Sequence, residues 1–351
     1  METYSFELEQ ELGKLSGIDL TTRFLAGRAD GRPPHALAIA WFFLTSAWHI
    51  ASHRRHYDII HFGDMVQIGL AWFSRLCGAN TCNVIALHGL DVIYGRRPGI
   101  GPRLYKAYTT FCRNRSVVDC FIANSRFTAQ LLEEEGFGPI SVVPLGVRIT
   151  CDAPGAPIEP IGDERFVLFF GRIFRRKGPR WFAEHVLPLL PEDVMFYVVG
   201  TVWDSQDGEY LHQNPRVRML GAFPVDFGRD QFESLKRRAI AVVMPNVINR
   251  DGKDVEGFGL TALEAADNGA PLIAADVEGI RDAVLHGQTG FLVAAEDNNA
   301  WAKLIVELLD WSVGQRQEFS RNAIAGLEQH FSWARVAQDT ANVYLRSMEN
   351  R

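Results

Sequence analysis

The alternation of short apolar runs with longer helical patterns is the feature that most restricts how this chain can fold. Runs such as NVIAL, CFIAN, RFVLFF, MFYVVG and PLIAA recur along the chain, with amphipathic stretches between them. Strands joined through helices return to lie parallel, so the alternation predicts βα units and parallel sheets. At 351 residues the chain is too long for one ordinary core, and we predict an α/β protein of two domains.

A stretch rich in prolines and acids marks the predicted boundary between the domains. The run CDAPGAPIEPIGDE interrupts the alternation of strands and helices. Clusters of proline and glycine are typical of exposed linkers. We therefore predict an N-terminal domain over residues 1–150, a linker over 151–164, a C-terminal domain over 165–331 and a terminal helix over 332–351.

Charge and cysteine content exclude several classes of protein. A net charge of -6 argues against a general nucleic-acid binder, which needs a broad excess of Lys and Arg. The acidic start METYSFELEQEL is unlike a secretory signal. The cysteines are odd in number and form no CxxC pair, which argues against a disulfide framework or a zinc site and favours a reducing cytoplasm: Cys77, Cys82, Cys112, Cys120 and Cys151.

The longest apolar stretch, ALAIAWFFLTSAWHIA over residues 36–51, also contains Thr, Ser and His. It is shorter than the roughly 20 residues that a membrane-spanning helix needs. We predict a buried helix in this position.

The start of the chain departs from the usual order of a doubly wound domain. Phe6, Leu8, Leu12 and Leu15 lie close to helical spacing, whereas such a domain normally opens on a strand in the middle of its sheet. We predict that the first strand of the N-terminal domain is missing. Our hypothesis is that Met1 is an internal methionine of a longer gene product.

A basic loop follows the predicted strand RFVLFF. Arg172, Arg175, Arg176, Lys177 and Arg180 fall close together with no acid among them. On an acidic protein, such a loop at the carboxyl end of a parallel strand is where an anionic ligand is expected. A solvated basic surface loop is the alternative.

Two glutamates flank a glycine-rich turn in DVEGFGLTALEAADNGAPLI. A helix that begins near Leu260, after Gly257 and Gly259, would offer free backbone N–H groups to phosphates. Glu264 would lie one turn inside this helix, where a carboxylate suits a ribose diol. Glu256 would point from the loop towards whatever the phosphates carry. Two exposed helical positions are the alternative for this pair.

Several segments together resemble the retaining glycosyltransferases of family 4, which have the GT-B fold. The segments are the Glu256-x7-Glu264 spacing, GRIFRRKG, ALHGLD, ANSRFTAQLL and VVPLGV, in the order that the family implies. The nearest resemblance is to the subset that includes phosphatidylinositol mannosyltransferases. The terminal FSWARVAQDTANVYL is similar to the family's last helices, which pack back on the N-terminal domain.

The resemblance implies two Rossmann-like doubly wound domains that face each other across a cleft. The first would hold the acceptor and the second the nucleotide sugar. The residues that it implies for catalysis are Glu256, His88, Arg172 and Lys177. Those that it implies for donor binding are Arg172, Lys177, Gly257, Phe258, Gly259, Leu260, Thr261 and Glu264.

The activity that the resemblance implies is transfer of a hexose from a UDP-, GDP- or ADP-linked sugar, with retention at the anomeric carbon. The acceptor would be a lipid, a polysaccharide or a small molecule in glycan or cell-envelope biosynthesis. No metal is needed, because no Asp-x-Asp motif or His and Cys cluster is present. We expect a cytoplasmic protein, with peripheral contact at the inner face of the membrane as a further expectation.

Alternatives stay open for the function and for some residues. A catalytically weak or inactive nucleotide-sugar-binding relative and a GT-B nucleotide-sugar epimerase are the other functions, whereas no GxGxxG turn supports an oxidoreductase. Asn124 and Ser125 precede an apolar helix and are predicted first as an N-cap. A basic group could meet a lipid headgroup or an anionic acceptor, or form a solvated face: Arg96, Arg97, Arg103 and Lys106. Many members of the family that the chain resembles have a Gly-x-Gly turn where this chain has VVGTVWD. The base of the donor nucleotide therefore stays open.

Overall fold

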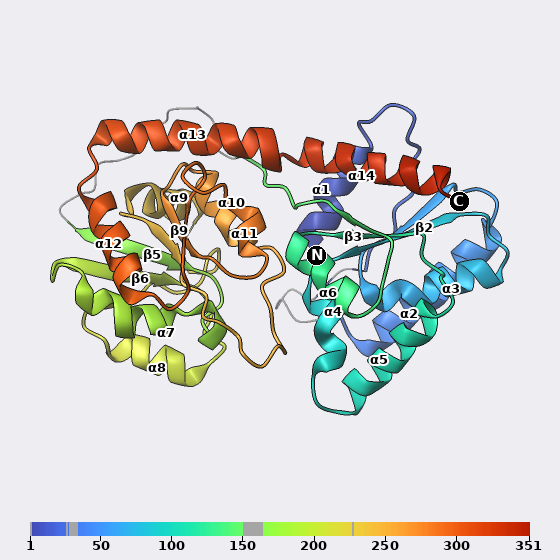
Figure 1. The fold of residues 1–351 in the computed structure, drawn as a ribbon, viewed down its shortest axis with the longest axis horizontal. Coiled ribbons are helices and arrows are strands. Elements are labelled where there is room, and N and C mark those ends of the chain that lie inside the picture. The colour runs from blue at the N-terminus through green and yellow to red at the C-terminus, as the bar shows by residue number, and fades with distance from the viewer. Residues whose placement is uncertain (1, 26, 28–33, 150–163, 227) are drawn as a thin grey trace. The chain divides into compact units, whose positions relative to one another are not determined.

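The computed structural model describes residues 2–25, 27, 34–149, 164–226 and 228–351 (Figure 1). The predicted linker over 151–164 lies outside these residues except for its last position. Contacts divide the chain into two compact units. Unit 1 comprises Met1–Gly146, Asp251–Phe258 and Trp333–Arg351, and unit 2 comprises Val147–Arg250 and Gly259–Ser332. Unit 1 therefore contains two segments from the second half of the sequence, one of them short.

Unit 1 is built on a four-stranded parallel sheet with the consecutive order β1-β2-β3-β4. Its strands are β1 (Ile59–Phe62), β2 (Cys82–Leu87), β3 (Cys120–Ala123) and β4 (Ile140–Val142). The described residues before Ile59 form no strand, and the order does not reverse as it does in a doubly wound sheet. That the first strand of this domain is missing from the chain stays a prediction.

Helices surround this sheet and join the two ends of the sequence. α14 packs on α1 and on β2, so the last helix of the chain lies against the first. The helices of unit 1 are α1 (Glu2–Leu12), α2 (Ala36–Ser52), α3 (Ile68–Leu76), α4 (Leu90–Ile93), α5 (Ile100–Arg113), α6 (Arg126–Glu134) and α14 (Trp333–Glu349), with 3₁₀ turns at Met65–Gln67 and Tyr94–Arg96.

The prediction that the apolar stretch over residues 36–51 is a buried helix is wrong. A helix, α2, does form there, but only Ser46 and Ile50 of it are buried. Four large apolar side chains are mostly in solvent, at 85% for Leu37, 69% for Trp41, 66% for Leu44 and 74% for Trp48. The sequence predicts burial because α2 is apolar on nearly all sides. In the structure only one side of the helix packs on α3.

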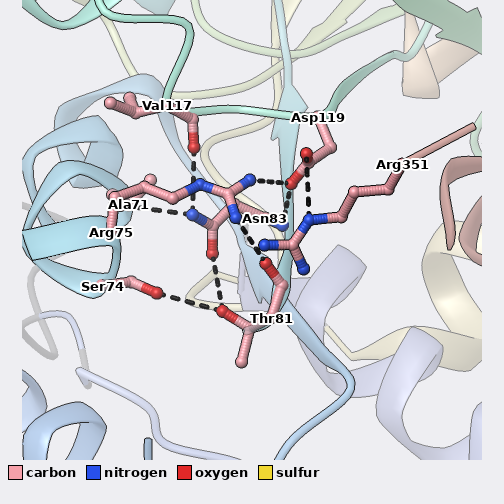
Figure 2. Close-up of polar contacts among 8 residues, drawn as sticks. All are labelled: Ala71, Ser74, Arg75, Thr81, Asn83, Val117, Asp119 and Arg351. Carbon is pink, nitrogen blue, oxygen red and sulfur yellow. Dashed lines mark hydrogen bonds and ion pairs between the residues drawn. The ribbon is translucent and has the colours of Figure 1, made fainter. Parts of the chain in front are cut away.

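Polar side chains tie the amino ends of β2 and β3 to helix α3 (Figure 2). The side-chain amide of Asn83 donates to the carbonyls of Ala71 and Val117, and Asp119 accepts from the backbone N–H of Asn83 and from Arg75. These groups satisfy each other at the edge of the sheet opposite the strands' carboxyl ends. We therefore assign this cluster a structural role.

Unit 2 is built on a six-stranded parallel sheet with the order β10-β9-β8-β5-β6-β7. The chain runs outward from β5 through β6 to β7, then returns to the other side of β5 with β8. The reversal between β5 and β8 is the switch point of a doubly wound sheet. The strands are β5 (Arg165–Phe170), β6 (Val194–Val199), β7 (Val217–Met219), β8 (Val242–Met244), β9 (Leu272–Ala275) and β10 (Phe291–Val293).

Helices on this sheet enclose a core that includes Phe182, Phe196 and Trp301. The first crossover is irregular, with 3₁₀ turns at Arg175–Lys177 and Leu187–Leu189 and a π-helical turn at Phe182–Val186. The other helices are α7 (Pro179–Trp181), α8 (Ser205–Gln213), α9 (Arg229–Arg238), α10 (Leu260–Ala266), α11 (Ile280–Ala283), α12 (Asn298–Leu309) and α13 (Val313–Phe331).

Candidate functional site

The basic loop of unit 2 begins directly at the carboxyl end of β5. Arg172 is exposed, and its guanidinium lies over the rings of Trp203 at 4.6 Å and Phe174 at 5.7 Å. Such cation–π contacts restrict the arginine without neutralising its charge. Lys177 ends the 3₁₀ turn that follows and is half-buried. Both predicted cations thus lie beside the carboxyl end of this strand.

The loop after β5 is locked to the loop after β8. Gly178 has a positive φ of 74°, and a Cβ atom there would lie 1.8 Å from the carbonyl oxygen of Pro245. The backbone N–H of Val247 donates to the carbonyl of Arg176 at 3.1 Å. Because β5 and β8 flank the switch point, the two loops meet where doubly wound sheets bind their ligands.

Helix α10 begins at Leu260, as predicted. Gly259 precedes it with a φ of 95°, which favours glycine. The backbone N–H groups of Leu260 and Thr261 lie in the first turn, where a helix offers them no internal partner. The N–H groups that we predict as hydrogen-bond donors therefore lie at the start of the helix.

A buried lysine that the sequence did not indicate supports Glu264. Lys236 is only 2% exposed; its ammonium donates to the backbone carbonyl of Glu264 at 2.8 Å and pairs with Asp267 at 3.1 Å and Glu233 at 3.0 Å. Glu264 itself is exposed; partial desolvation by the groups around it raises the pKa of its carboxyl, while the charges of Lys236 and Lys177 oppose that rise. One signal was available, since Lys236 lies one turn after Phe232 on the buried side of α9.

The segment Asp251–Phe258, which carries Glu256, belongs to unit 1. A Cβ atom on Gly257 would lie 1.8 Å from the carbonyl oxygen of His88, and one on Gly89 would lie 2.9 Å from the Cα of Gly257. Only glycine permits so close an approach of two backbones. The His-Gly pair after β2 thus fixes the half-buried Glu256 through its neighbour.

The start of α6 holds the same segment. Ser125 is the N-cap of α6, as predicted, and its hydroxyl accepts from the backbone N–H of Thr128 at 2.9 Å. That hydroxyl also donates to the carbonyl of Gly257 at 2.6 Å, and the Thr128 hydroxyl lies 3.3 Å from the same carbonyl. The cap therefore has a second role that the sequence analysis missed.

His88 follows β2 and is enclosed in unit 1. Its ring meets Tyr4 edge-on with 5.0 Å between centroids, and its Nε2 atom is buried without a partner among the described residues. Burial lowers the pKa of His88 to about 3, so the imidazole is neutral near pH 7. Its backbone N–H donates to Asp91, and burial with the nearby charge of Asp64 raises the pKa of Asp91 to about 7.

The predicted site residues fall on both units. Unit 2 carries Arg172, Lys177, Gly259, Leu260, Thr261 and Glu264, whereas unit 1 carries His88, Glu256, Gly257 and Phe258. The sequence separates the two glutamates by only eight positions, and the chain passes from one unit to the other between them.

Within the described ranges, no three His, Cys, Asp or Glu side chains are grouped so as to hold a metal ion. The described helices likewise include none with the length and apolar character needed to span a bilayer. Cys77, Cys82, Cys112 and Cys120 are free, and Cys151 lies outside the described residues.

Solved structures similar to this one have the GT-B fold. Sucrose-phosphate synthase from Thermosynechococcus elongatus aligns with a TM-score of 0.68 and 21% identity, over 99% of this chain and 94% of that one. HepE of Anabaena in complex with UDP aligns with a TM-score of 0.67 and 20% identity, over 85% of this chain and 81% of that one. The predicted GT-B fold is confirmed.

Family models and curated relatives match the sequence itself. Glycosyltransferase Family 4 matches residues 5–150, and Glycosyl transferases group 1 matches residues 164–310. D-inositol 3-phosphate glycosyltransferase 2 of Catenulispora acidiphila is 33% identical over 66% of this chain, a match that spans just over half (57%) of the relative's length. D-inositol 3-phosphate glycosyltransferase of Streptomyces avermitilis is 30% identical over 86% of this chain, and the match spans 68% of the relative's length. The chain belongs to glycosyltransferase family 4.

Proposed function

We propose that this chain is a glycosyltransferase that moves a hexose from a nucleotide diphosphate sugar to an acceptor hydroxyl, with retention at the anomeric carbon and without a bound metal. The observation that carries the proposal is the arrangement at the switch point of unit 2. The loop after β5 carries the two cations, and the loop after β8 leads to the start of α10. A backbone hydrogen bond joins these two loops.

The diphosphate would bind to Arg172 and Lys177. The contact of Arg172 with Trp203 orients the guanidinium while leaving its donors available to phosphate oxygens. The N–H groups of Leu260 and Thr261 would supply further hydrogen bonds, and Gly259 would let the phosphates approach the backbone. These groups would also stabilise the negative charge that develops on the leaving nucleoside diphosphate.

Glu264 would accept hydrogen bonds from the ribose hydroxyls. The network of Lys236, Asp267 and Glu233 fixes the helical turn that carries it. The charges of Lys236 and Lys177 favour the carboxylate form that a diol requires. A carboxylate acceptor gives stronger hydrogen bonds than a neutral one.

Glu256 would hold the hydroxyls of the donor sugar, with His88 beside it as a neutral imidazole. In the transfer, the bond from the anomeric carbon to the diphosphate oxygen breaks and the bond to the acceptor oxygen forms. The acceptor hydroxyl loses its proton in the same process, and the departing diphosphate oxygen would take it up. Retention means that the new bond lies on the face from which the leaving group departed.

UDP is the first nucleotide to test, because one structure of the similar protein HepE contains UDP and another contains UDP-glucose. D-inositol 3-phosphate glycosyltransferases are among the curated relatives, which supports a glycosyl transfer. The acceptor classes that we propose are lipids, polysaccharides and small polyols.

The test is calorimetric titration with UDP, GDP and ADP, with and without EDTA. We expect saturable binding of one nucleotide that EDTA does not change, and a loss of at least tenfold in affinity in Lys177→Ala. Lys303→Ala is the matched control, since Lys303 is an exposed lysine on α12 of the same unit. Equal affinity in Lys177→Ala and the control would overturn the assigned phosphate site.

Turnover separates the remaining functions. A transferase releases the nucleoside diphosphate in proportion to an added acceptor. An epimerase changes the bound sugar without an acceptor, and an inactive relative binds the nucleotide and releases nothing. Either of these outcomes would refute the transferase while leaving the binding site intact.

A further inference from the structure

Helix α2 presents a continuous apolar stripe to solvent. Leu37, Trp41, Leu44 and Trp48 follow each other at intervals of four, three and four residues, so they share one face of the helix. All four are mostly exposed. Tryptophan pairs of this kind are costly to leave in water, which indicates that something covers the stripe.

The apolar surface continues beyond this stripe onto two neighbouring helices. α2 and α5 both pack on α3, as Figure 1 shows. An open groove of about 490 Å³ lies among the three helices. Leu44 belongs both to the stripe and to the lining of the groove, together with Phe73 of α3 and Tyr108 of α5. On α5 the exposed Ile100 and Leu104 extend the same apolar character.

This part of the chain is also strongly basic. Residues 34–118 contain nine Arg and Lys against three Asp and no Glu, a formal charge of +6 on a chain whose net charge is -6. Three of these cations, Arg75, Arg96 and Lys106, pair with acids that follow this range. Arg54 and Arg55 directly follow α2, Arg103 lies in the first turn of α5, and Arg115 follows α5. All four are exposed, and no ion pair joins any of them to an acid among the described residues. The rest of the protein therefore carries the acidic charge.

We propose that the surface formed by α2, the groove and α5, which we call the docking face, binds the surface of an anionic lipid bilayer. Tryptophan side chains prefer the boundary between headgroups and acyl chains, and arginines beside them pair with anionic headgroups. The groove would accept apolar groups of the outer part of the bilayer. The proposal stands on the docking face alone and does not depend on the proposed transfer reaction.

Charge decides against a second copy of this chain as the occupant. Two copies that meet through this face would bring two basic surfaces together, and such surfaces repel. An anionic bilayer offers both an apolar layer and negative charge. It is therefore the partner that complements both properties of the face.

The test is co-sedimentation of the whole protein with vesicles of phosphatidylcholine that contain or lack about a third of phosphatidylglycerol. We expect binding to the anionic vesicles that weakens as salt is added, because exposed charges are screened. The double variant Trp41→Gln with Trp48→Gln should lose about tenfold in vesicle affinity. Leu189→Gln is the control for loss of an exposed apolar side chain in unit 2, away from the loops after β5 and β8.

A charge variant tests the second property of the face. Arg54→Glu with Arg55→Glu should lose about tenfold on anionic vesicles, whereas Arg250→Glu, an exposed arginine of unit 2, should not. The melting temperature of each variant shows whether the fold is retained.

Three results would overturn the proposal. The first is no binding of the folded wild type to anionic vesicles, and the second is equal binding by the Trp41 and Trp48 double variant. The third is a stable dimer of the wild type that this variant converts to a monomer, since the docking face would then be an interface between copies. Nucleotide binding by unit 2 is measured separately, so a failure of either proposal can be told from a failure of the other.

Discussion

Glu256 and Glu264 are close in sequence but are held in place by different means. Glu264 lies on a helix of unit 2 whose turn is fixed by the buried charge of Lys236. Glu256 lies in a segment of unit 1 that is fixed by backbone contact at Gly257, where a side chain has no room. The position of Glu264 therefore depends on a buried ionic network, whereas the position of Glu256 depends on a neighbouring glycine that has no side chain.

The largest effect is expected from breaking the ionic network. Lys236→Met removes the ammonium that pairs with the buried Asp267, which should lower the free energy of unfolding by about 3 kcal/mol. It also removes a charge that opposes the raised pKa of Glu264, so UDP binding should weaken further at low pH. Urea unfolding and calorimetry measure both effects. Lys303→Met, at an exposed position, should change the stability by less than about 0.5 kcal/mol.

The backbone contact is broken by Gly257→Ala. The new methyl group would meet the carbonyl of His88, so the segment and Glu256 must shift. We expect the rate of UDP release from the donor sugar to fall about a hundredfold, because small displacements in a reacting site cost that much. The UDP dissociation constant should stay within about twofold, since unit 2 is unaltered.

Gly101→Ala in α5 is the matched control within unit 1, because its nearest neighbour would be at an ordinary 3.6 Å. Wild-type turnover in Gly257→Ala would mean that the close approach has no part in holding Glu256.

A pair of conservative variants sharpens the comparison between the two carboxylates. Glu264→Gln should weaken UDP binding about tenfold, because a neutral amide replaces a charged acceptor of the ribose hydroxyls. Glu256→Gln should leave the UDP dissociation constant unchanged and lower the turnover number. Isothermal titration and steady-state kinetics distinguish the two, and identical profiles would remove the division of roles.

The smallest effect is expected from acid, and it acts through unit 1. The Nε2 atom of the half-buried His61 is out of contact with water, and this desolvation lowers the pKa of His61 to about 4. As the pH falls below about 6.5, the unfolded chain takes up a proton that the folded chain refuses, so stability present above pH 6.5 is lost. The contribution of His61 to the loss between pH 6.5 and 5.5 is about 1 kcal/mol, so the loss should be smaller by about that amount in His61→Gln than in the wild type.

Comparing the two proteins by urea unfolding isolates His61 from Asp91 and from His88, whose lowered pKa acts in the same direction as that of His61. The raised pKa of Asp91 acts in the opposite direction, since its folded form keeps a proton that the unfolded chain releases. An equal pH dependence in the wild type and in His61→Gln would show that this histidine does not contribute.

The elements of the fold could be predicted where local pattern and tertiary contact agree. RFVLFF and PLIAA are buried strands because apolar side chains on both faces suit a parallel sheet covered by helices. The cap at Ser125 was also predictable, because it depends on atoms within four residues.

The rest depends on contacts that are distant in sequence. The assignment of Asp251–Phe258 to unit 1 follows from the fit of Gly257 against His88, about 170 positions away. The burial of Lys236 on α9 depends on Asp267, which lies at the end of α10. The exposure of α2 could not be predicted, because hydropathy records that a side chain avoids water and not what covers it.

The contact of α14 with α1 has a consequence for synthesis on the ribosome. Unit 2 is complete once residue 332 has emerged, so it can fold while the ribosome is still translating. Unit 1 needs residues at both ends of the chain, and its first helix is made long before the helix that covers it. The apolar side of α1 is therefore exposed to chaperones until α14 has emerged, and chains that stop before α14 should fold only in part.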